Sequence, residues 1–133
     1  MSSRKLEDLT IGLQESFVIL KKLYEEKFPD RKIILTCTYR SPQEQLCLFK
    51  KGRDAKGKVV AKSKITTNCD GIKKLSKHNY YPAKAFDFAI IKNGKALWNK
   101  NYFLTAGKII KELDLAWGGR WKIKDYCHVE IGD

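Results

Sequence analysis

The two histidines of this chain both lie where an imidazole could bind a metal. His78 opens a run that leads to Asp87, and His128 lies near the end of the sequence, three residues after Asp125. Two imidazoles and one carboxylate, with a fourth position left for water, are the ligand set of a catalytic zinc site. A histidine taken alone is more often structural or exposed, so each needs support from its surroundings.

Two expected strands would place these residues. Residues 85–91 alternate, with Phe86, Phe88 and Ile90 on the core face. The other face, Ala85, Asp87 and Ala89, reads as a small-residue surface with one projecting acid, which suits the floor of a site. A closing strand around residues 127–131 sets Tyr126, His128 and Glu130 on one face, and Cys127, Val129 and Ile131 on the other.

The remaining patterns predict helices around a small sheet. An apolar stripe from Leu6 to Tyr24 predicts one helix over about the first thirty residues. A buried strand is expected over 33–38, followed by a helix to about residue 51 that Ser41 caps. A tight turn over 92–95, a short strand over 96–98 and a helix over about 102–113 complete the prediction. The fold class is α+β: a mostly antiparallel sheet, about three helices, and the zinc site on the sheet face.

Charge is concentrated in one segment. The chain has 133 residues, 43% of them hydrophobic, which predicts a single domain over residues 1–133 without a separate wall-binding domain. Its net charge is +12, and residues 50–77 alone carry ten basic residues against Asp54 and Asp70. This balance predicts a polyanionic partner: nucleic acid, an acidic membrane surface or a bacterial cell wall. Residues 50–77 read as a long loop, which is either a solvated segment or a functional one.

The lack of a targeting signal and the pattern of cysteines predict a protein that is made and kept in a cytoplasm until it is released. No apolar run is long enough to span a membrane, and acidic residues follow the N-terminus at once, so neither membrane insertion nor a secretory signal is expected. The four cysteines form no CxxC pair and read as reduced, mostly buried thiols. Cys127 alternates onto the apolar face of its strand, which argues against a ligand role.

Four separated motifs together resemble the zinc peptidases that cut bacterial peptidoglycan. They are Tyr39-Arg40-Ser41-Pro42-x-Glu44-Gln45, Ser76-x-His78 leading to Ala85-x-Asp87, Trp117-Gly118-Gly119, and Asp125-x-x-His128. That family includes D-alanyl-D-alanine carboxypeptidases and the L-alanyl-D-glutamate endopeptidases that phages use as endolysins. The resemblance spans roughly residues 33–131, nearly all of the chain after the first expected helix.

The resemblance implies a role for five residues. His78, Asp87 and His128 would bind Zn²⁺, Asp125 would be the general base, and Arg40 would stabilise the scissile carbonyl or hold a substrate carboxylate. One feature departs from the common family form, which places histidine and aspartate seven residues apart with a glycine between them. Here they are nine apart, with Tyr81-Pro82-Ala83 in between, so the resemblance does not fix the shape of the substrate cleft.

Other readings of the site residues remain. Residues three apart on a strand face opposite sides, so Asp125 must lie before the strand or across a bend, and it could instead orient a ligand histidine. Arg40 could be a surface ion-pair partner, and Glu130 could either support His128 or be solvated. Trp117 and Trp121 read as core rather than glycan-stacking residues, and nothing decides whether Tyr80 and Tyr81 line a groove.

These observations predict a monomeric zinc metallopeptidase, a hydrolase that acts on peptidoglycan stem peptides. The first choice is an L-alanyl-D-glutamate endopeptidase, a bacteriophage or prophage endolysin that causes host lysis by cell wall degradation. It would wait in the host cytoplasm until released to the periplasm and cell wall. The alternative is a D-alanyl-D-alanine carboxypeptidase. A non-catalytic basic wall-binding protein, or a nucleic-acid-binding protein, would explain the charge but not the histidine motifs, and no nucleic-acid module is recognised.

Overall fold

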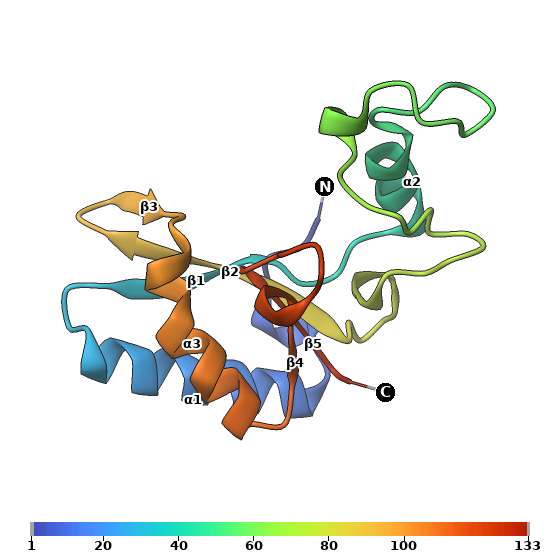
Figure 1. Ribbon diagram of the computed structural model, residues 1–133. Helices are drawn as coiled ribbons and strands as arrows, with labels where there is room; N and C mark the ends of the chain where they lie inside the picture. Colours follow the sequence, from blue (N-terminus) through green and yellow to red (C-terminus); the bar gives the residue numbers. More distant parts are fainter. Residues whose placement is uncertain (1, 133) are drawn as a thin grey trace.

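The computed structural model describes residues 2–132. This part of the chain contains three α-helices and one five-stranded sheet, joined by loops and 3-10 turns (Figure 1). The helices are α1 (Ile11–Lys27), α2 (Pro42–Lys50) and α3 (Lys100–Glu112). The strands are β1 (Lys32–Cys37), β2 (Ala85–Lys92), β3 (Lys95–Leu97), β4 (Ala116–Trp117) and β5 (His128–Glu130).

The sheet is antiparallel and centred on β2. Its order is β1-β2-β5-β4, with β3 added to the far end of β2 as a hairpin. Asn93 and Gly94, with φ of 52° and 75°, form the tight turn of that hairpin, as the sequence predicts. The expected α+β class and mostly antiparallel sheet are confirmed, while the two-residue strand β4 was not predicted.

The first helix starts later than its apolar stripe. Leu6 lies in a short 3-10 turn and Leu9 is extended, pairing with Ala83 in an isolated bridge. Thr10 then caps α1, because its side-chain oxygen accepts the amide of Leu13 at 3.3 Å. The prediction of one helix from residue 6 was therefore wrong at its start: Leu6 and Leu9 pack against the core from a non-helical segment.

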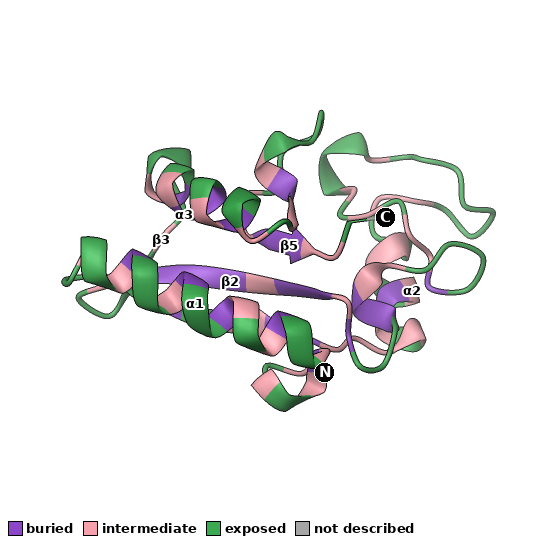
Figure 2. Ribbon diagram, turned by 90° about the horizontal axis from the view of Figure 1, so that it is seen from below, coloured by how far each residue is buried: buried purple, intermediate pink, exposed green. Residues whose placement is uncertain are grey.

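The core lies between the sheet and two helices. α1 and α3 contact one another and cover one side of the sheet, so purple buried stripes face inward in Figure 2. The predicted core face of β2 is confirmed: Phe86, Phe88 and Ile90 are fully buried. The opposite face was expected to be surface, yet Ala85 and Ala89 are also buried. β2 is a central strand between β1 and β5, and on this face Asp87 and Ile91 keep partial exposure.

The basic segment 50–77 stands away from the sheet with α2 (Figure 1). We call residues 42–77 the basic lobe. It holds a short 3-10 turn at Lys62–Lys64 and a bridge between Arg53 and Val59, so the expected long loop has some local structure. Arg53 holds it together by donating to the carbonyls of Phe49 and Thr67 and to the side chain of Asn68. None of the helices described is long and apolar enough to cross a membrane.

Candidate metal centre

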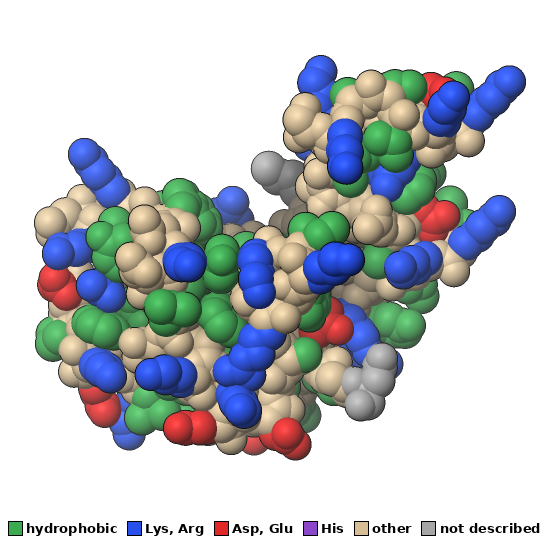
Figure 3. Space-filling model, in the orientation of Figure 1, with side chains coloured by type: hydrophobic (Ala, Val, Ile, Leu, Met, Phe, Trp, Pro, Cys, Tyr) green, Lys and Arg blue, Asp and Glu red, His purple; other side chains and the backbone are tan. Residues whose placement is uncertain are grey.

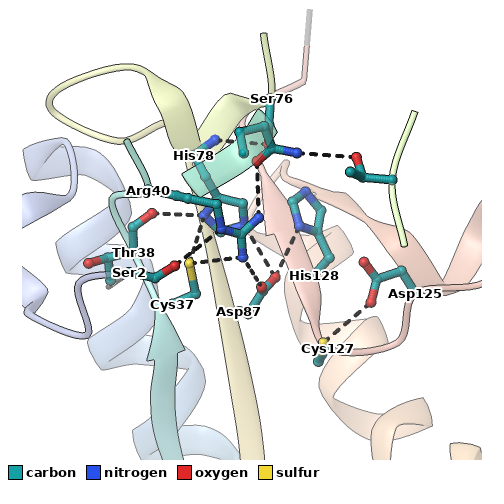
Figure 4. A network of polar contacts seen from close by, with 12 residues as sticks. Ser2, Cys37, Thr38, Arg40, Ser76, His78, Asp87, Asp125, Cys127 and His128 are labelled. Carbon is teal, nitrogen blue, oxygen red and sulfur yellow. Dashed lines mark hydrogen bonds and ion pairs between the residues drawn. The ribbon is translucent and has the colours of Figure 1, made fainter. Parts of the chain in front are cut away.

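Asp87 is the centre of the site, because three cationic or metal-binding side chains turn towards its carboxylate (Figure 4). Its Oδ1 lies 3.4 Å from His78 Nε2 and 3.1 Å from His128 Nδ1. Its Oδ2 lies 4.0 Å from Arg40 Nη2. The sheet register explains part of this assembly, since Asp87 pairs directly with His128 across β2 and β5, and paired residues project from the same face.

His78 comes from a capped turn rather than from the sheet. Ser76 Oγ accepts the amide of His78, and Asn79 Oδ1 accepts the amide of Ser76, which fixes the 3-10 turn Lys77–Asn79. The turn is tied to the end of β1, because the amide of Arg40 donates to the His78 carbonyl at 2.9 Å and Asn79 donates to the Arg40 carbonyl at 2.8 Å. The motifs around Arg40 and His78, far apart in sequence, therefore form one structural unit.

Each imidazole is held at the nitrogen that faces away from Asp87. His78 Nδ1 lies 2.7 Å from the Thr38 carbonyl, to which it donates, and His128 Nε2 lies 2.8 Å from Glu130 Oε1. These contacts leave His78 Nε2 and His128 Nδ1 directed towards Asp87. An outer carboxylate or carbonyl that fixes the tautomer in this way is the usual support of a metal-ligating histidine. Of the two readings of Glu130, support of His128 is the one observed.

The pKa values of His78, Asp87 and His128 are shifted by their mutual contacts. Burial alone would lower the pKa of His78, but hydrogen bonds and charges of Asp87 and Cys37 raise it to about 10. Burial would likewise lower the pKa of His128, yet Asp87 and Glu130 raise it. Burial alone would raise the pKa of Asp87, and the two imidazoles hold it below its usual range. Asp87 thus needs positive charge beside it, from protons on the rings or from a metal.

A metal ion fits this donor set. His78 is only 2% exposed, and its buried Nε2 faces Asp87 Oδ1 at 3.4 Å without a well-formed hydrogen bond, a contact that a bound cation would complete. Metal binding would supply both the missing partner and the positive charge. Two neutral imidazoles and a carboxylate match the nitrogen and oxygen ligands of zinc.

Cys37 joins this cluster, and sequence reasoning missed it. Its Sγ lies 3.6 Å from His78 Nδ1, and one ligand atom each from Cys37, His78 and Asp87 lie within 4.8 Å of one another. Burial alone would raise the pKa of its thiol, but His78 and Arg40 lower it. The expectation of mostly buried thiols was wrong, because Cys37 is the one buried cysteine, Cys47 is exposed and the other two are intermediate; all four are free.

Arg40 is an internal group rather than a surface ion-pair partner. Its side chain is 16% exposed and donates to Ser2 Oγ, Gln45 Oε1 and Cys37 Sγ. The guanidinium lines a pocket that also reaches Thr36, Cys37 and Asp87. A ligand entering this pocket would meet Arg40 and Asp87 together.

Asp125 is exposed and lies before β5, so the sequence argument that it must precede the strand is confirmed. Its amide donates to the Gly118 carbonyl, and its own carbonyl accepts the amide of His128 at 3.2 Å. This turn brings the Asp125 carboxylate to the His128 side of the cluster (Figure 4). The Cys127 thiol donates to this carboxylate at 3.3 Å. Within residues 2–132, His128 Nε2 is paired with Glu130 rather than with Asp125.

The aromatic residues near the site divide into core and surface. Trp117 is 6% exposed and donates to the Tyr126 carbonyl, as expected of a core residue. The prediction was wrong for Trp121, which is 38% exposed and lies over His128, with the two ring centres 5.0 Å apart. Tyr80 and Tyr81 are exposed; Tyr81 packs on Tyr39 and donates to Asp8, away from the histidines.

Comparisons with known proteins bear out the resemblance. Residues 70–131 match the family model described as D-alanyl-D-alanine carboxypeptidase. The peptidoglycan L-alanyl-D-glutamate endopeptidase CwlK of Bacillus subtilis is 34% identical over 74% of this chain. The match covers 60% of CwlK, so this chain spans less than two thirds of that relative.

A solved structure supports the fold. The L-Ala D-Glu endopeptidase ChiX of Serratia marcescens superposes with a TM-score of 0.61 over 99% of this chain and 89% of its own. The two sequences are 18% identical, so the likeness concerns the fold alone. The matched family region contains His78, Asp87, Asp125 and His128, while Arg40 lies outside it.

Proposed function

From the resemblance to peptidases that cut bacterial peptidoglycan, we propose that this chain is a zinc-dependent endopeptidase of peptidoglycan stem peptides. The bond that we assign is the one between L-alanine and D-glutamate, which is the bond that the printed names of CwlK and ChiX give for those proteins. The observation that carries the proposal is the convergence of His78 and His128 on Asp87. In this proposal the three residues are the zinc ligands.

The chain's own groups would divide the chemistry between them. When bound, zinc supplies a Lewis acid that polarises the scissile carbonyl and lowers the pKa of a water. Asp125 accepts the proton of the attacking water and returns it to the leaving amine. Arg40, held by Ser2 and Gln45, presents its guanidinium to the negative charge that develops on the carbonyl oxygen or to a substrate carboxylate. Thr38 and Glu130 keep the imidazoles oriented.

Asp125 provides the sharpest test of this division of labour. Replacing Asp125 with Asn removes the proton acceptor but keeps the size of the side chain, so kcat on a stem peptide should fall about 10²- to 10⁴-fold. Zinc affinity should stay within about twofold, because Glu130 rather than Asp125 contacts His128. Asp114→Asn, at an exposed turn after α3, is the matched control and should change neither quantity. A loss of zinc affinity with unchanged kcat at saturating zinc would instead make Asp125 a support of the metal site.

The second candidate is a D-alanyl-D-alanine carboxypeptidase, and the description of the matching family model favours it. Arg40 could bind the terminal carboxylate of such a substrate in the pocket beside Asp87. Release of terminal D-alanine without a newly exposed D-glutamyl amine would select this alternative.

The biological setting that we propose is lysis of a bacterial host by a phage or prophage endolysin. The protein would act as a monomer, accumulate in the host cytoplasm and reach the wall once released. Expression in a bacterial host, with and without a membrane-permeabilising protein, tests this setting. Lysis only when the membrane is opened is expected, and wall cleavage during undisturbed growth would contradict it.

A further inference from the structure

The buried thiol of Cys37 lies at the metal centre but has no part in the mechanism proposed above. It is 4% exposed, and its Sγ lies 3.6 Å from His78 Nδ1, the nitrogen that donates to the Thr38 carbonyl, and 3.4 Å from Arg40 Nη2. The proposed zinc ligands are the imidazoles and Asp87, with water as the fourth ligand. The presence of a sulfur donor beside three nitrogen and oxygen donors requires its own explanation.

The backbone directs this thiol towards the site. Cys37 pairs with Asp87 across β1 and β2, and directly paired residues of an antiparallel sheet project from the same face. The register shifts between Leu35 and Cys37, so two steps along β1 match one step along β2. Such a bulge changes the direction of the side chains that follow it. Cys37 therefore shares a face with Asp87 because of an irregularity that regular alternation would not reveal.

The surroundings of the thiol are those of a ligand. Donor atoms of Cys37, His78 and Asp87 lie within 4.8 Å of one another, close enough to meet at one cation after small side-chain movements. The neighbouring donor His78 is buried as well, and its Nε2 faces Asp87 Oδ1 at 3.4 Å without a well-formed hydrogen bond, so it can turn to a cation. The pocket that Cys37, Arg40 and Asp87 line gives an ion a path to the cluster.

We propose that Cys37 is an additional metal ligand, which lets the centre bind thiophilic cations such as Cd²⁺ with sulfur in the coordination shell. On binding, the thiol releases its proton to solvent, and sulfur occupies a position that water would otherwise take. A site closed by four protein donors resembles structural zinc sites, whereas catalytic sites keep one position open. Coordination by Cys37 therefore favours a tightly bound, inactive form of the centre. The inference rests on the proposed function, because it uses the same metal site.

Cadmium absorption tests this assignment without any measurement of activity. A chain whose only thiol is Cys37 (C47S/C69S/C127S) should give the ultraviolet sulfur-to-cadmium charge-transfer band with one equivalent of Cd²⁺. The matched control keeps Cys127 alone (C37S/C47S/C69S). Its thiol follows Asp125 and precedes His128 but contacts neither His78 nor Asp87 in the described structure, so the band should be absent. Circular dichroism checks that both variants are folded.

A third variant links the sulfur to the metal site. Adding His78→Ala to the Cys37-only chain leaves the thiol in place but removes its neighbouring donor, and the band should fall by at least tenfold at the same cadmium concentration. Equilibrium dialysis measures the bound cadmium in each case. Cadmium bound to the Cys37-only chain without a charge-transfer band would overturn ligation by Cys37. A band that survives His78→Ala would overturn the assignment of Cys37 to the His78–Asp87 centre, and either result would leave the proposed function standing. Failure of the wild-type chain to bind either Cd²⁺ or Zn²⁺ would overturn both.

Discussion

At the scale of single residues, the orientation of each imidazole is set by the group that contacts its outer ring nitrogen. The Thr38 carbonyl and the Glu130 carboxylate occupy the outer nitrogens of His78 and His128, so both rings present their other nitrogen to Asp87. The carbonyl is part of the backbone and cannot be removed by substitution. Glu130 can be, and it separates support of a ligand from ligation itself.

Glu130→Ala should weaken zinc binding about 10- to 100-fold, the usual effect of removing the outer partner of a ligand histidine. The stoichiometry at saturating zinc should be unchanged, because His78, Asp87 and His128 all remain. Competition with a chromophoric chelator measures the affinity. Glu112→Ala, an exposed position at the end of α3, is the control and should leave the affinity as it was. Equal zinc affinity of Glu130→Ala and wild type would mean that Glu130 does not support the metal site.

At the scale of elements, the sheet pairs Asp87 with His128, and α1 anchors the sheet. Glu25 on α1 accepts the amide of Ile33 on β1 at 2.9 Å and lies 2.6 Å from Lys21 Nζ. Burial alone would raise the pKa of Glu25, but the hydrogen bonds from Lys21 and Ile33 and the charges of Lys21 and Lys32 lower it. The ionised carboxylate therefore stabilises the contact between helix and strand.

Glu25→Gln should lower the free energy of unfolding at neutral pH by about 1 kcal/mol, the usual net value of a hydrogen bond. Because the pKa is lower in the folded state, the contribution is complete above the unfolded value of about 4.3. It is lost as the pH falls through the lower folded value, so wild type and variant should converge in acid. Urea unfolding across this pH range measures the difference. The exposed Glu26→Gln should match wild type throughout; a Glu25→Gln difference that grew in acid would contradict the prediction.

Two helical glycines test the packing, because replacing each with alanine should change the stability of the fold in opposite directions. A Cβ at Gly107 of α3 would clash with the ring of Trp117, whereas one at Gly12 of α1 would meet nothing within 4 Å. Gly107→Ala should therefore destabilise the fold by about 1–3 kcal/mol through overpacking. Gly12→Ala should stabilise it by about 0.5 kcal/mol, because alanine loses less backbone entropy in a helix. Thermal unfolding of both variants measures the signs, and two shifts in the same direction would contradict this packing.

The sequence predicts the elements better than their ends, and the site better than its supports. Periodicity predicts α1 and α3, and the capping pattern at Ser41 predicts α2. Periodicity does not show that α1 begins only after Thr10, because Leu6 and Leu9 continue its apolar stripe from outside the helix. The motifs identify His78, Asp87 and His128, which the structure brings together. The position of Cys37 at the site was not predicted, because its direction depends on a bulge in β1, whereas alternation assumes a regular strand. The contact of Trp121 with His128 was not predicted, because only tertiary packing places the indole over that ring.

At the scale of the whole molecule, the basic lobe lies beside the candidate site, and lysine and arginine side chains also project from the rest of the face shown in Figure 3. Lysine and arginine side chains project from the basic lobe in Figure 3, while the metal centre lies where the lobe meets the sheet. The two acids of residues 50–77 are partly used by backbone: Asp54 accepts two amides and Asp70 accepts three. The lobe therefore presents a mainly cationic surface beside the site, which suits an anionic cell wall.

Neutralising this surface should weaken wall binding in a salt-dependent way. K56Q/K58Q/K73Q removes three exposed lysines of the basic lobe, and K100Q/K108Q/K111Q removes three exposed lysines of α3 with the same change in net charge. Sedimentation with purified walls should show several-fold weaker binding for the first variant and a smaller effect for the second. The difference should disappear at about 1 M salt, where charges are screened within about 3 Å. Equal losses would mean that net charge, rather than the lobe, governs binding.

The most direct experiment is mass spectrometry of purified peptidoglycan digested with metal-free protein and with the same protein after zinc is restored. We expect products with a newly freed D-glutamyl amine only when zinc is present. Bound zinc without any new amino group, on walls of several chemotypes, would contradict the assignment of this chain as a peptidoglycan endopeptidase.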